Sequence, residues 1–375
     1  MKRVNILLPL VATLLCSCQA TAINEETTAA MDANSAANIE VNPAANIKDT
    51  STTIIGVNHI GLSVKDLDKE LAFYREATNF ELVSRETVSH NKDADRLFGR
   101  QDIAYEIAVL KAPNMLLELT EFEHNKDAEI SRMPAKGPGM THTCFQSPSS
   151  DPGWAKFVNA GATPLTWGGE PVDLGGYGVT YGYAYDPEGN MMELEQLDGN
   201  VLSRVGYDKT WKDLGEVMWM SQVALVTHDI DRLMNFYHGV LGFQPYRKAE
   251  LRDNVRADQI VGYENSQVLA GWFRMNETSK VIEFWQYVNP ATPEFEGERD
   301  VTDLGYSFSL EVTDIQKEYQ RLTDLGVEFV SEPVRLGEFW QAYTRDLDSN
   351  IFSLRQAVDV ESELSVRKLD VNKLL

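Results

Sequence analysis

The feature that most constrains the fold of this chain is a repeat between its two halves. In both halves an aspartate, a tyrosine and a phenylalanine follow an alternating apolar stretch at the same three intervals, counted from His59 (Asp66, Tyr74, Phe80) and from Gln222 (Asp229, Tyr237, Phe243). Three equal intervals are improbable by chance. The chain must therefore be explained as a repeated architecture before any single motif is interpreted.

Each half also contains a second, related unit. His142 precedes Gly161 by the same interval at which Ser307 precedes Gly326. Both of these units end in a turn-forming stretch with aspartate first and asparagine last, at 186–190 and at 346–350. The offset between the two halves is nearly the same for the first unit and for the second. The chain therefore consists of four related units, two in each half.

The hydrophobic pattern predicts the order of elements within a unit. In the first unit, alternation predicts a strand over 57–64, helical spacing predicts a helix over 67–77, and further strands are expected near 80–88, 102–110 and 114–122. In the second unit, the stretch Asp186-Pro187-Glu188-Gly189-Asn190 is a turn signal between two apolar strands. Each unit is thus a strand, a helix and three more strands, which gives an α+β fold.

These features together resemble the vicinal oxygen chelate superfamily, which contains glyoxalases, bleomycin-resistance proteins and extradiol dioxygenases. The resemblance covers about residues 54–358 and rests on the four tandem units, His59 and His142 in the opening strands of the first two, and Gly189, Asn190 and Glu193 near the end of the second. It implies four βαβββ modules paired into two domains. The expected layout is a metal-binding domain at 54–200, a connector at 201–215, a degenerate second domain at 216–358 and a fraying tail at 359–375.

The resemblance also implies one metal site, because members of this superfamily place ligands in the opening and final strands of each module. Carried over by position, the ligands in the first half are His59, Glu118, His142 and Glu193. Such a set suits Zn, Fe, Mn or Ni. Buried glutamates in apolar strands also require a cation. Glu195, on the same face as Glu193, is the alternative ligand.

Each of these residues has an ordinary structural explanation as well. A histidine on an alternating strand is often a hydrogen-bonded core residue, and Glu118 in its leucine-rich strand would then face solvent. Cys144, two residues after His142, faces the same side of its strand and could touch the metal pocket, but burial as a small apolar side chain is the favoured explanation.

The second half departs from the ligand pattern. Its corresponding residues are Gln222, Glu283, Ser307 and Ser353, of which one is a strong ligand. We therefore expect no metal there. The second domain is expected to support the first, to close over its site, or to hold a separate organic ligand.

Three functions agree with these residues. The first is a metal-dependent lyase or isomerase that stabilises an enediolate of a small oxygenated substrate, with Glu118 or Glu193 as the catalytic base. The second is an extradiol dioxygenase, for which Tyr183, ten residues before Glu193, fits as a catalytic residue, although 172–182 lacks the histidine that the resemblance requires. The third is a non-enzymatic small-molecule binder of the resistance type.

The N-terminal stretch 1–18 has the pattern of a bacterial export signal. Lys2 and Arg3 precede an apolar run that is too short to span a bilayer, and Cys18 after a small residue fits the lipidated cysteine of a lipobox. We expect a lipoprotein signal at 1–18 and a disordered tether at 19–53, with Gln19 indicating the periplasmic face of the outer membrane. Cleavage after Ala22 would instead give a soluble periplasmic protein.

Composition limits the partners. The chain has 57 acidic and 34 basic residues, a formal charge of −23, so phosphate backbones would repel it and nucleic acid is excluded. With three cysteines, two of them in the export signal, the folded part has no disulfide framework. The expected partner is a small-molecule substrate, and a monomer agrees with the sequence.

Overall fold

The computed structural model describes residues 39–41, 51–176, 178–204, 217–275 and 280–369. Within them the four expected modules are present, at 54–122, 139–197, 219–289 and 305–357. The predicted α+β class and βαβββ order are confirmed. The export signal and most of the predicted tether and connector lie outside the described residues.

The strands and helices of each module follow the predicted order. The first module contains β2 (Ile54–Val64), α2 (Leu67–Thr78), β3 (Glu81–Val88), α3 (Lys92–Phe98), β4 (Tyr105–Lys111) and β5 (Leu116–Phe122). The second contains β6 (Gly139–Pro148), α4 (Gly153–Ala160), the short β7 (Thr163–Pro164) and β8 (Val172–Asp173), β9 (Val179–Tyr185) and β10 (Met191–Leu197). The sequence did not predict α3.

The second half repeats this order. The third module contains β11 (Trp219–Val226), α7 (Ile230–Leu241), β12 (Arg247–Leu251), α8 (Val255–Val261), β13 (Gln267–Arg274) and β14 (Val281–Asn289). The fourth contains β15 (Gly305–Val312), α9 (Ile315–Asp324), β16 (Val334–Leu336), β17 (Phe339–Arg345) and β18 (Ile351–Ala357). The aspartates that recur in the sequence cap the helices: Asp66 and Asp229 each accept a hydrogen bond from the backbone N–H three residues on.

The modules combine into two sheets, and the partners differ from the expected ones. In the eight-stranded sheet, β2 of the first module pairs antiparallel with β15 of the fourth. In the ten-stranded sheet, β6 of the second module pairs antiparallel with β11 of the third. The opening strand would otherwise be a free edge of its module, and joining two such edges satisfies their backbone groups. The first two modules therefore share no sheet.

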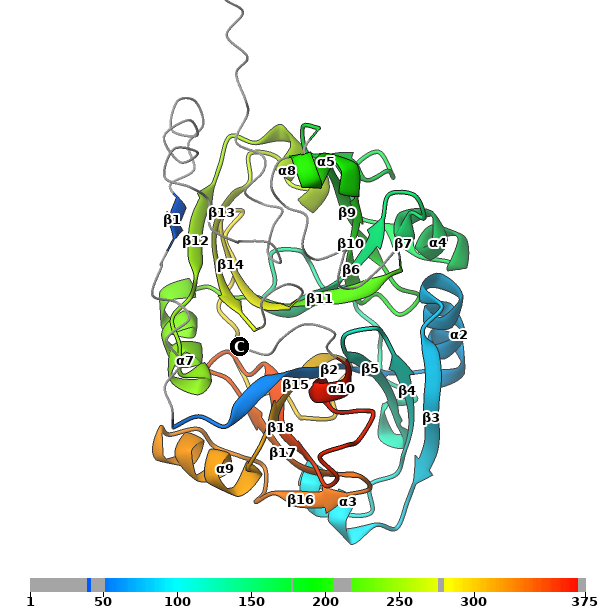
Figure 1. The fold of residues 1–375 in the computed structure, drawn as a ribbon, viewed down its shortest axis with the longest axis vertical. Coiled ribbons are helices and arrows are strands. Elements are labelled where there is room, and N and C mark those ends of the chain that lie inside the picture. Colours follow the sequence, from blue (N-terminus) through cyan, green and yellow to red (C-terminus); the bar gives the residue numbers. More distant parts are fainter. Residues whose placement is uncertain (1–38, 42–50, 177, 205–216, 276–279, 370–375) are drawn as a thin grey trace, which may run out of the picture.

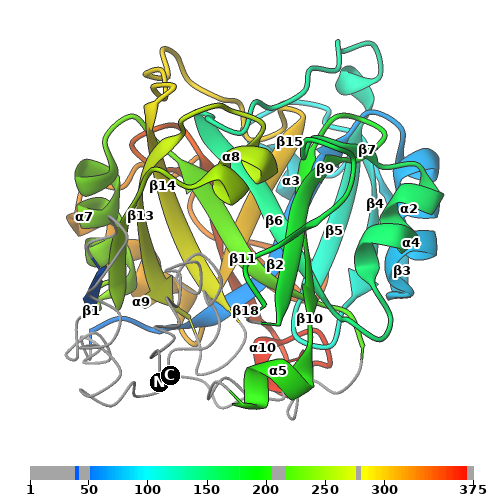
Figure 2. The ribbon, with the colours of Figure 1, turned by 90° about the horizontal axis from the view of Figure 1, so that it is seen from above.

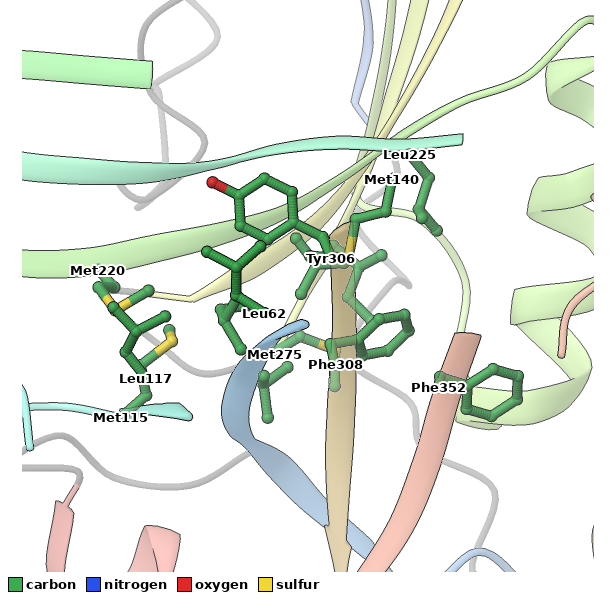
Figure 3. Close-up of a cluster of buried hydrophobic side chains, with 14 of the residues drawn as sticks. Leu62, Met115, Leu117, Met140, Met220, Leu225, Met275, Tyr306, Phe308 and Phe352 are labelled. Atoms are coloured by element: carbon green, nitrogen blue, oxygen red, sulfur yellow. The ribbon is translucent and has the colours of Figure 1, made fainter. Parts of the chain in front are cut away.

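The two sheets pack against each other through one apolar core (Figure 1). Figure 3 shows side chains of this core: Met140, Met220, Leu225 and Met275 come from the part of the chain that forms the ten-stranded sheet, and Leu62, Leu117, Tyr306 and Phe308 come from the eight-stranded sheet. Each sheet curls away from this contact. We call the face turned away from the shared core the inner face of the sheet.

Helices cover the two sides of the molecule. In Figure 2, α2 and α4 lie on one side of the sheets and α7 lies on the other. The contact between α2 and α4 joins the first module to the second. A hydrogen bond from the Tyr74 hydroxyl of α2 to Asp186, in the turn between β9 and β10, strengthens this contact; Tyr237 and Asp346 repeat it in the second half. No helix in the described ranges is long and apolar enough to cross a membrane.

Two expectations about flanking segments need correction. Ile39–Val41, within the predicted disordered tether, forms strand β1 and pairs with β12. The predicted fraying tail contains helix α10 (Val366–Leu369), whose Val366 and Leu369 are buried. Glu311 holds this segment because its carboxylate accepts hydrogen bonds from the Ser365 hydroxyl and the Val366 N–H.

Glu70 in α2 is a buried acid without a hydrogen-bond partner. Its side chain is fully buried, and neither carboxylate oxygen has a partner within the described part of the chain. Burial, followed by the nearby charges of Asp186 and Glu188, raises the pKa of Glu70 to about 10. The residue at the corresponding position of α7 is Leu233, which is also fully buried. The helix therefore carries an acid where its repeat carries a leucine.

Glu70 should make the protein less stable as pH rises. Above pH ~4.5 the unfolded chain ionises Glu70 while the folded chain keeps it protonated, so the unfolded state binds fewer protons and the free energy of unfolding falls. At ~1.4 kcal/mol per pH unit, this loss reaches about 3 kcal/mol at pH 7. Glu70→Leu should recover it, with a gain below about 1 kcal/mol at pH 5 and about 3 kcal/mol at pH 7 in urea unfolding.

A matched control for this substitution is Glu76→Leu, because Glu76 is exposed on the same helix. It should change the free energy of unfolding little at either pH. An equal gain from Glu70→Leu at both values of pH would contradict the assignment of a raised pKa to Glu70.

Candidate metal centre

Four adjacent strands of the ten-stranded sheet each supply one polar side chain to a single cluster on its inner face. The strands lie in the order β14, β11, β6 and β10 and carry Glu283, Gln222, His142 and Glu193. Side chains alternate along a strand, and Met192 and Leu194 enter the core between the sheets. Glu193 therefore faces the other side, where the cluster lies.

His142 and Gln222 each lie within hydrogen-bond distance of both carboxylates of the cluster. His142 Nε2 is 3.1 Å from Glu193 Oε2 and 3.2 Å from Glu283 Oε1. Gln222 Nε2 donates to the same two oxygens at 3.0 Å each. All four residues are at most 5% exposed. The cluster is thus compact and closed to solvent.

Neighbouring groups fix the orientation of these side chains. Trp272 Nε1 donates to Glu283 Oε2 at 2.9 Å, and the Thr141 hydroxyl lies 2.9 Å from His142 Nδ1. Tyr183, predicted as a catalytic residue, is buried with its ring centroid 4.9 Å from that of His142. A hydrogen bond from Tyr183 also reaches Glu193. Tyr183 therefore contacts two members of the cluster.

Glu195, the alternative ligand of the sequence analysis, has its own partner. Gln146 Nε2 donates to Glu195, and Gln146 Oε1 accepts from Trp219 Nε1 at 2.7 Å. Burial, and then the charge of Glu193, raise the pKa of Glu195 well above its ordinary value. Cys144, Glu193 and Glu195 have ligand atoms within 4.8 Å of one another, so Cys144 borders the cluster as the sequence suggested.

The pKa values of His142 and Glu193 are both raised above their ordinary values. Burial alone would lower the pKa of His142, but hydrogen bonds to Glu193 and Glu283 raise it to about 9. Burial, partly offset by His142, raises the pKa of Glu193, and the charge of Glu283 adds to this shift. Two acidic side chains thus share one histidine in a buried site, an arrangement that a further positive charge would stabilise.

The donor set fits a divalent cation. Ligand atoms of His142, Glu193 and Glu283 lie within 4.8 Å of one another, and two carboxylates balance the charge of a divalent ion. Gln222 would contribute its amide oxygen after a half-turn of the amide, because its nitrogen now faces the carboxylates. A cation and a proton would compete for His142 Nε2, since both require the same lone pair.

The other two predicted ligands lie in the eight-stranded sheet, on β2 and β5. His59 Nε2 is 3.4 Å from Glu118 Oε2, and both side chains are buried. Arg355 of β18 forms an ion pair with Glu118, and its NH1 lies 2.7 Å from His59 Nδ1. The guanidinium also stacks on Phe339, with its carbon 3.6 Å from the ring centroid. The cation that Glu118 requires is therefore an arginine of the fourth module.

Burial and the charge of Arg355 both shift the pKa values of His59 and Glu118 in this second cluster. Burial lowers the pKa of His59 to about 4, a shift that the charge of Glu118 opposes and that of Arg355 reinforces. Burial would raise the pKa of Glu118, but Arg355 and His59 bring it below its ordinary value. At neutral pH the cluster holds a neutral imidazole and one ion pair, which needs no metal for charge balance.

The prediction that His59, Glu118, His142 and Glu193 form one site is therefore wrong. The structure brings His142 together with Glu193, and His59 together with Glu118, in different sheets. Glu118, the other predicted catalytic base, lies on β5 of the eight-stranded sheet in an ion pair with Arg355 and is not part of the cluster around His142. The second half, in which we expected no metal, nevertheless supplies Gln222 and Glu283 to the cluster around His142.

The sequence contained a signal for this arrangement. Asn190 precedes Glu193 by three residues and Asn350 precedes Ser353 by three, so Arg355 occupies the position of Glu195. The arginine at this position supplies the positive charge that pairs with Glu118. Conversely, Gln222 and Glu283 complete a ligand set only if the second and third modules pair.

Comparisons with known proteins agree with the fold. A sequence profile of the Glyoxalase/Bleomycin resistance protein/Dioxygenase superfamily matches residues 56–194 and 219–350. The fold and the cluster thus define a protein of the vicinal oxygen chelate type. The chain belongs to the Glyoxalase/Bleomycin resistance protein/Dioxygenase superfamily.

Two solved structures illustrate the similarity in fold. Glyoxalase I from Zea mays is 18% identical, with a TM-score of 0.53, and the match covers 82% of this chain and 95% of that protein. A candidate dioxygenase from Bacillus subtilis is 13% identical, with a TM-score of 0.51 and coverage of 86% and 92%. At these identities the likeness concerns the fold alone. A search of curated protein sequences found no match.

Proposed function

We propose that this protein is a metal-dependent isomerase or lyase that acts on a small substrate with adjacent oxygen atoms. The observation that carries the proposal is the buried cluster of four side chains, His142, Glu193, Gln222 and Glu283. The nitrogen atoms of His142 and Gln222 lie 3.0 to 3.2 Å from the carboxylate oxygens. A divalent ion held there would supply Lewis-acid stabilisation of negative charge on the substrate oxygens. Zn, Fe, Mn and Ni all agree with the ligand types.

Glu193 is the proposed proton-transfer residue. Its pKa is raised by burial and by the charge of Glu283, which brings it closer to neutral pH, where a general base works best. Tyr183 and His142 position its carboxylate from two sides.

The ligand types favour this reaction over ring cleavage. Non-haem iron dioxygenases use two histidines and one carboxylate. The cluster contains one histidine, and His59, the other predicted ligand, lies in the other sheet beside Arg355. Tyr183 agrees with both chemistries and does not separate them.

The proposed function is tested by measuring proton exchange in several candidate substrates rather than turnover of a single one. The purified full chain, supplied with Zn, Fe, Mn or Ni, is incubated in D₂O with α-hydroxyketones and with α-ketoaldehyde–thiol adducts, and deuterium at the carbon next to the carbonyl is followed by NMR. Exchange should need metal and should fall at least about 100-fold in Glu193→Gln. Metal binding without exchange or turnover would favour the non-enzymatic binder, and catechol cleavage would favour the dioxygenase.

We also propose that the protein works in the bacterial cell envelope, anchored through lipidated Cys18 and facing the periplasm. The support is the sequence pattern of residues 1–18. Labelled palmitate should be incorporated into the wild-type protein and not into Cys18→Ala. Equal labelling of both would refute the anchor, and a soluble unlabelled protein would support cleavage after Ala22.

A further inference from the structure

Arg247 is a buried arginine on the inner face of the ten-stranded sheet. It lies on β12 beside Trp272 of β13, with which it is in register, and it is 6% exposed. Ala249 and Leu251, at alternate positions of β12, belong to the apolar cluster of the inner face, whereas Lys248 is exposed and pairs with Asp231. Arg247 therefore faces the same side as the metal cluster.

Two of the three guanidinium nitrogens of Arg247 lack a polar partner among the described residues. The guanidinium carbon lies 3.8 Å from the centroid of the Trp272 ring, and Nε and NH2 are buried without a hydrogen-bond partner among the described residues. Trp285 Nε1, on the same inner face, is also buried and unpartnered within the described ranges. A buried charge without an ion pair is costly, so a site of this kind is completed by an anion.

Trp272 connects Arg247 to the metal cluster. One face of its indole supports the guanidinium, while its Nε1 donates to Glu283 Oε2 at 2.9 Å. Arg247 and Glu283 are thus separated by one indole ring. Beside this ring, β12 and β13 carry the small residues Ala249 and Ala270, paired in register. A molecule bound at the cluster would extend along this side without meeting a large side chain from these two positions.

We propose that Arg247 binds an oxyanion group of the substrate, a carboxylate or a phosphate, at the side of the molecule away from the atoms that chelate the metal. Planar guanidinium groups bind such oxyanions with two parallel N–H donors, and Nε and NH2 provide that pair. The inference rests on the proposed function for the role of the cluster. It narrows the substrate class to small anionic molecules with adjacent oxygen atoms.

The test uses the metal-free full chain with succinate and with inorganic phosphate as probes. Binding is followed by tryptophan fluorescence and by melting temperature, with chloride matching the ionic strength. At least one probe should bind saturably and raise the melting temperature of the wild type. Arg247→Met should weaken this binding at least about tenfold, as expected for a lost charged hydrogen-bond pair. Whichever probe binds more tightly identifies the oxyanion.

Two variants make the result specific. Lys248→Met removes a positive charge from the same strand on its other side and should bind the probes like the wild type. Should Arg247→Met fail to fold, Arg247→Lys takes its place, since lysine keeps the charge but loses the paired donors. The proposal is overturned if neither probe binds the wild type or if the Arg247 variant binds as well.

Metal content measured on the same samples separates this inference from the proposed function. Arg247→Met should keep the metal affinity of the wild type, because Arg247 contacts no member of the cluster directly. If no variant binds metal but oxyanion binding still depends on Arg247, the proposed function fails and the oxyanion site stands. If metal binds and neither oxyanion probe does, the oxyanion site fails and the proposed function stands.

Discussion

Replacing Glu283 with alanine is expected to abolish metal binding, although Glu283 lies in the half of the chain that carries fewer ligand types. Glu283 Oε1 contacts both His142 Nε2 and Gln222 Nε2, so its loss removes one of two negative charges from the cluster. Loss of a residue behind a ligand already weakens metal binding about 10- to 100-fold. Loss of a ligand itself should exceed about 100-fold.

The matched control is Glu118→Ala, the same change at the corresponding strand of the other sheet. Glu118 pairs with Arg355 and not with a metal, so this variant should keep one metal ion per folded chain. The measurement is elemental analysis after dialysis against a weak chelator. The opposite pattern, with metal retained in Glu283→Ala and lost in Glu118→Ala, would move the metal centre to the eight-stranded sheet.

Replacing Arg355 with methionine is expected to destabilise the fold by about 3–5 kcal/mol, the usual cost of removing one partner of a buried ion pair. Arg355 NH1 contacts Glu118, His59 and Asn58, and its side chain is 6% exposed. Without it, Glu118 would be a buried charge with only a neutral imidazole beside it. Urea unfolding at pH 7 measures the loss.

A double variant tests the cause of that loss. Glu118→Met with Arg355→Met removes both charges and leaves apolar side chains of similar size, a change that is often neutral or stabilising for buried pairs. The double variant should therefore recover most of the stability lost in Arg355→Met. A double variant as unstable as the single one would show that Arg355 acts by packing on Phe339 rather than by neutralising Glu118.

Much of the fold could be predicted from the sequence because its signals are local. The strand predicted at 57–64 and the helix predicted at 67–77 from alternation and helical spacing correspond to β2 and α2, which Asp66 caps. The turn after β9 follows from Asp186, whose carboxylate accepts hydrogen bonds from Glu188 N–H and Asn190 N–H. The repeat then extends these assignments to the second half.

Two members of the cluster, His142 and Glu193, were predicted as ligands from the sequence. Gln222 and Glu283 were noted only as the counterparts of His59 and Glu118, in a half expected to hold no metal. The sequence analysis was wrong about which modules pair to form a sheet. Backbone hydrogen bonds between opening strands carry no sequence label, so β2 with β6 and β2 with β15 are equally compatible with the pattern. Pairing neighbours along the chain was the simpler assumption, and the structure contradicts it.

The sequence by itself determined that four βαβββ modules form, and which strand of each module carries a polar side chain at the ligand position. Those properties depend on short intervals along the chain, which local geometry fixes. Only the tertiary structure decided that Glu193 meets Glu283 while Glu118 meets Arg355. The pairing of opening strands depends on contacts between segments that are far apart in the sequence. Strand β2 belongs to the first module and its partner β15 to the fourth.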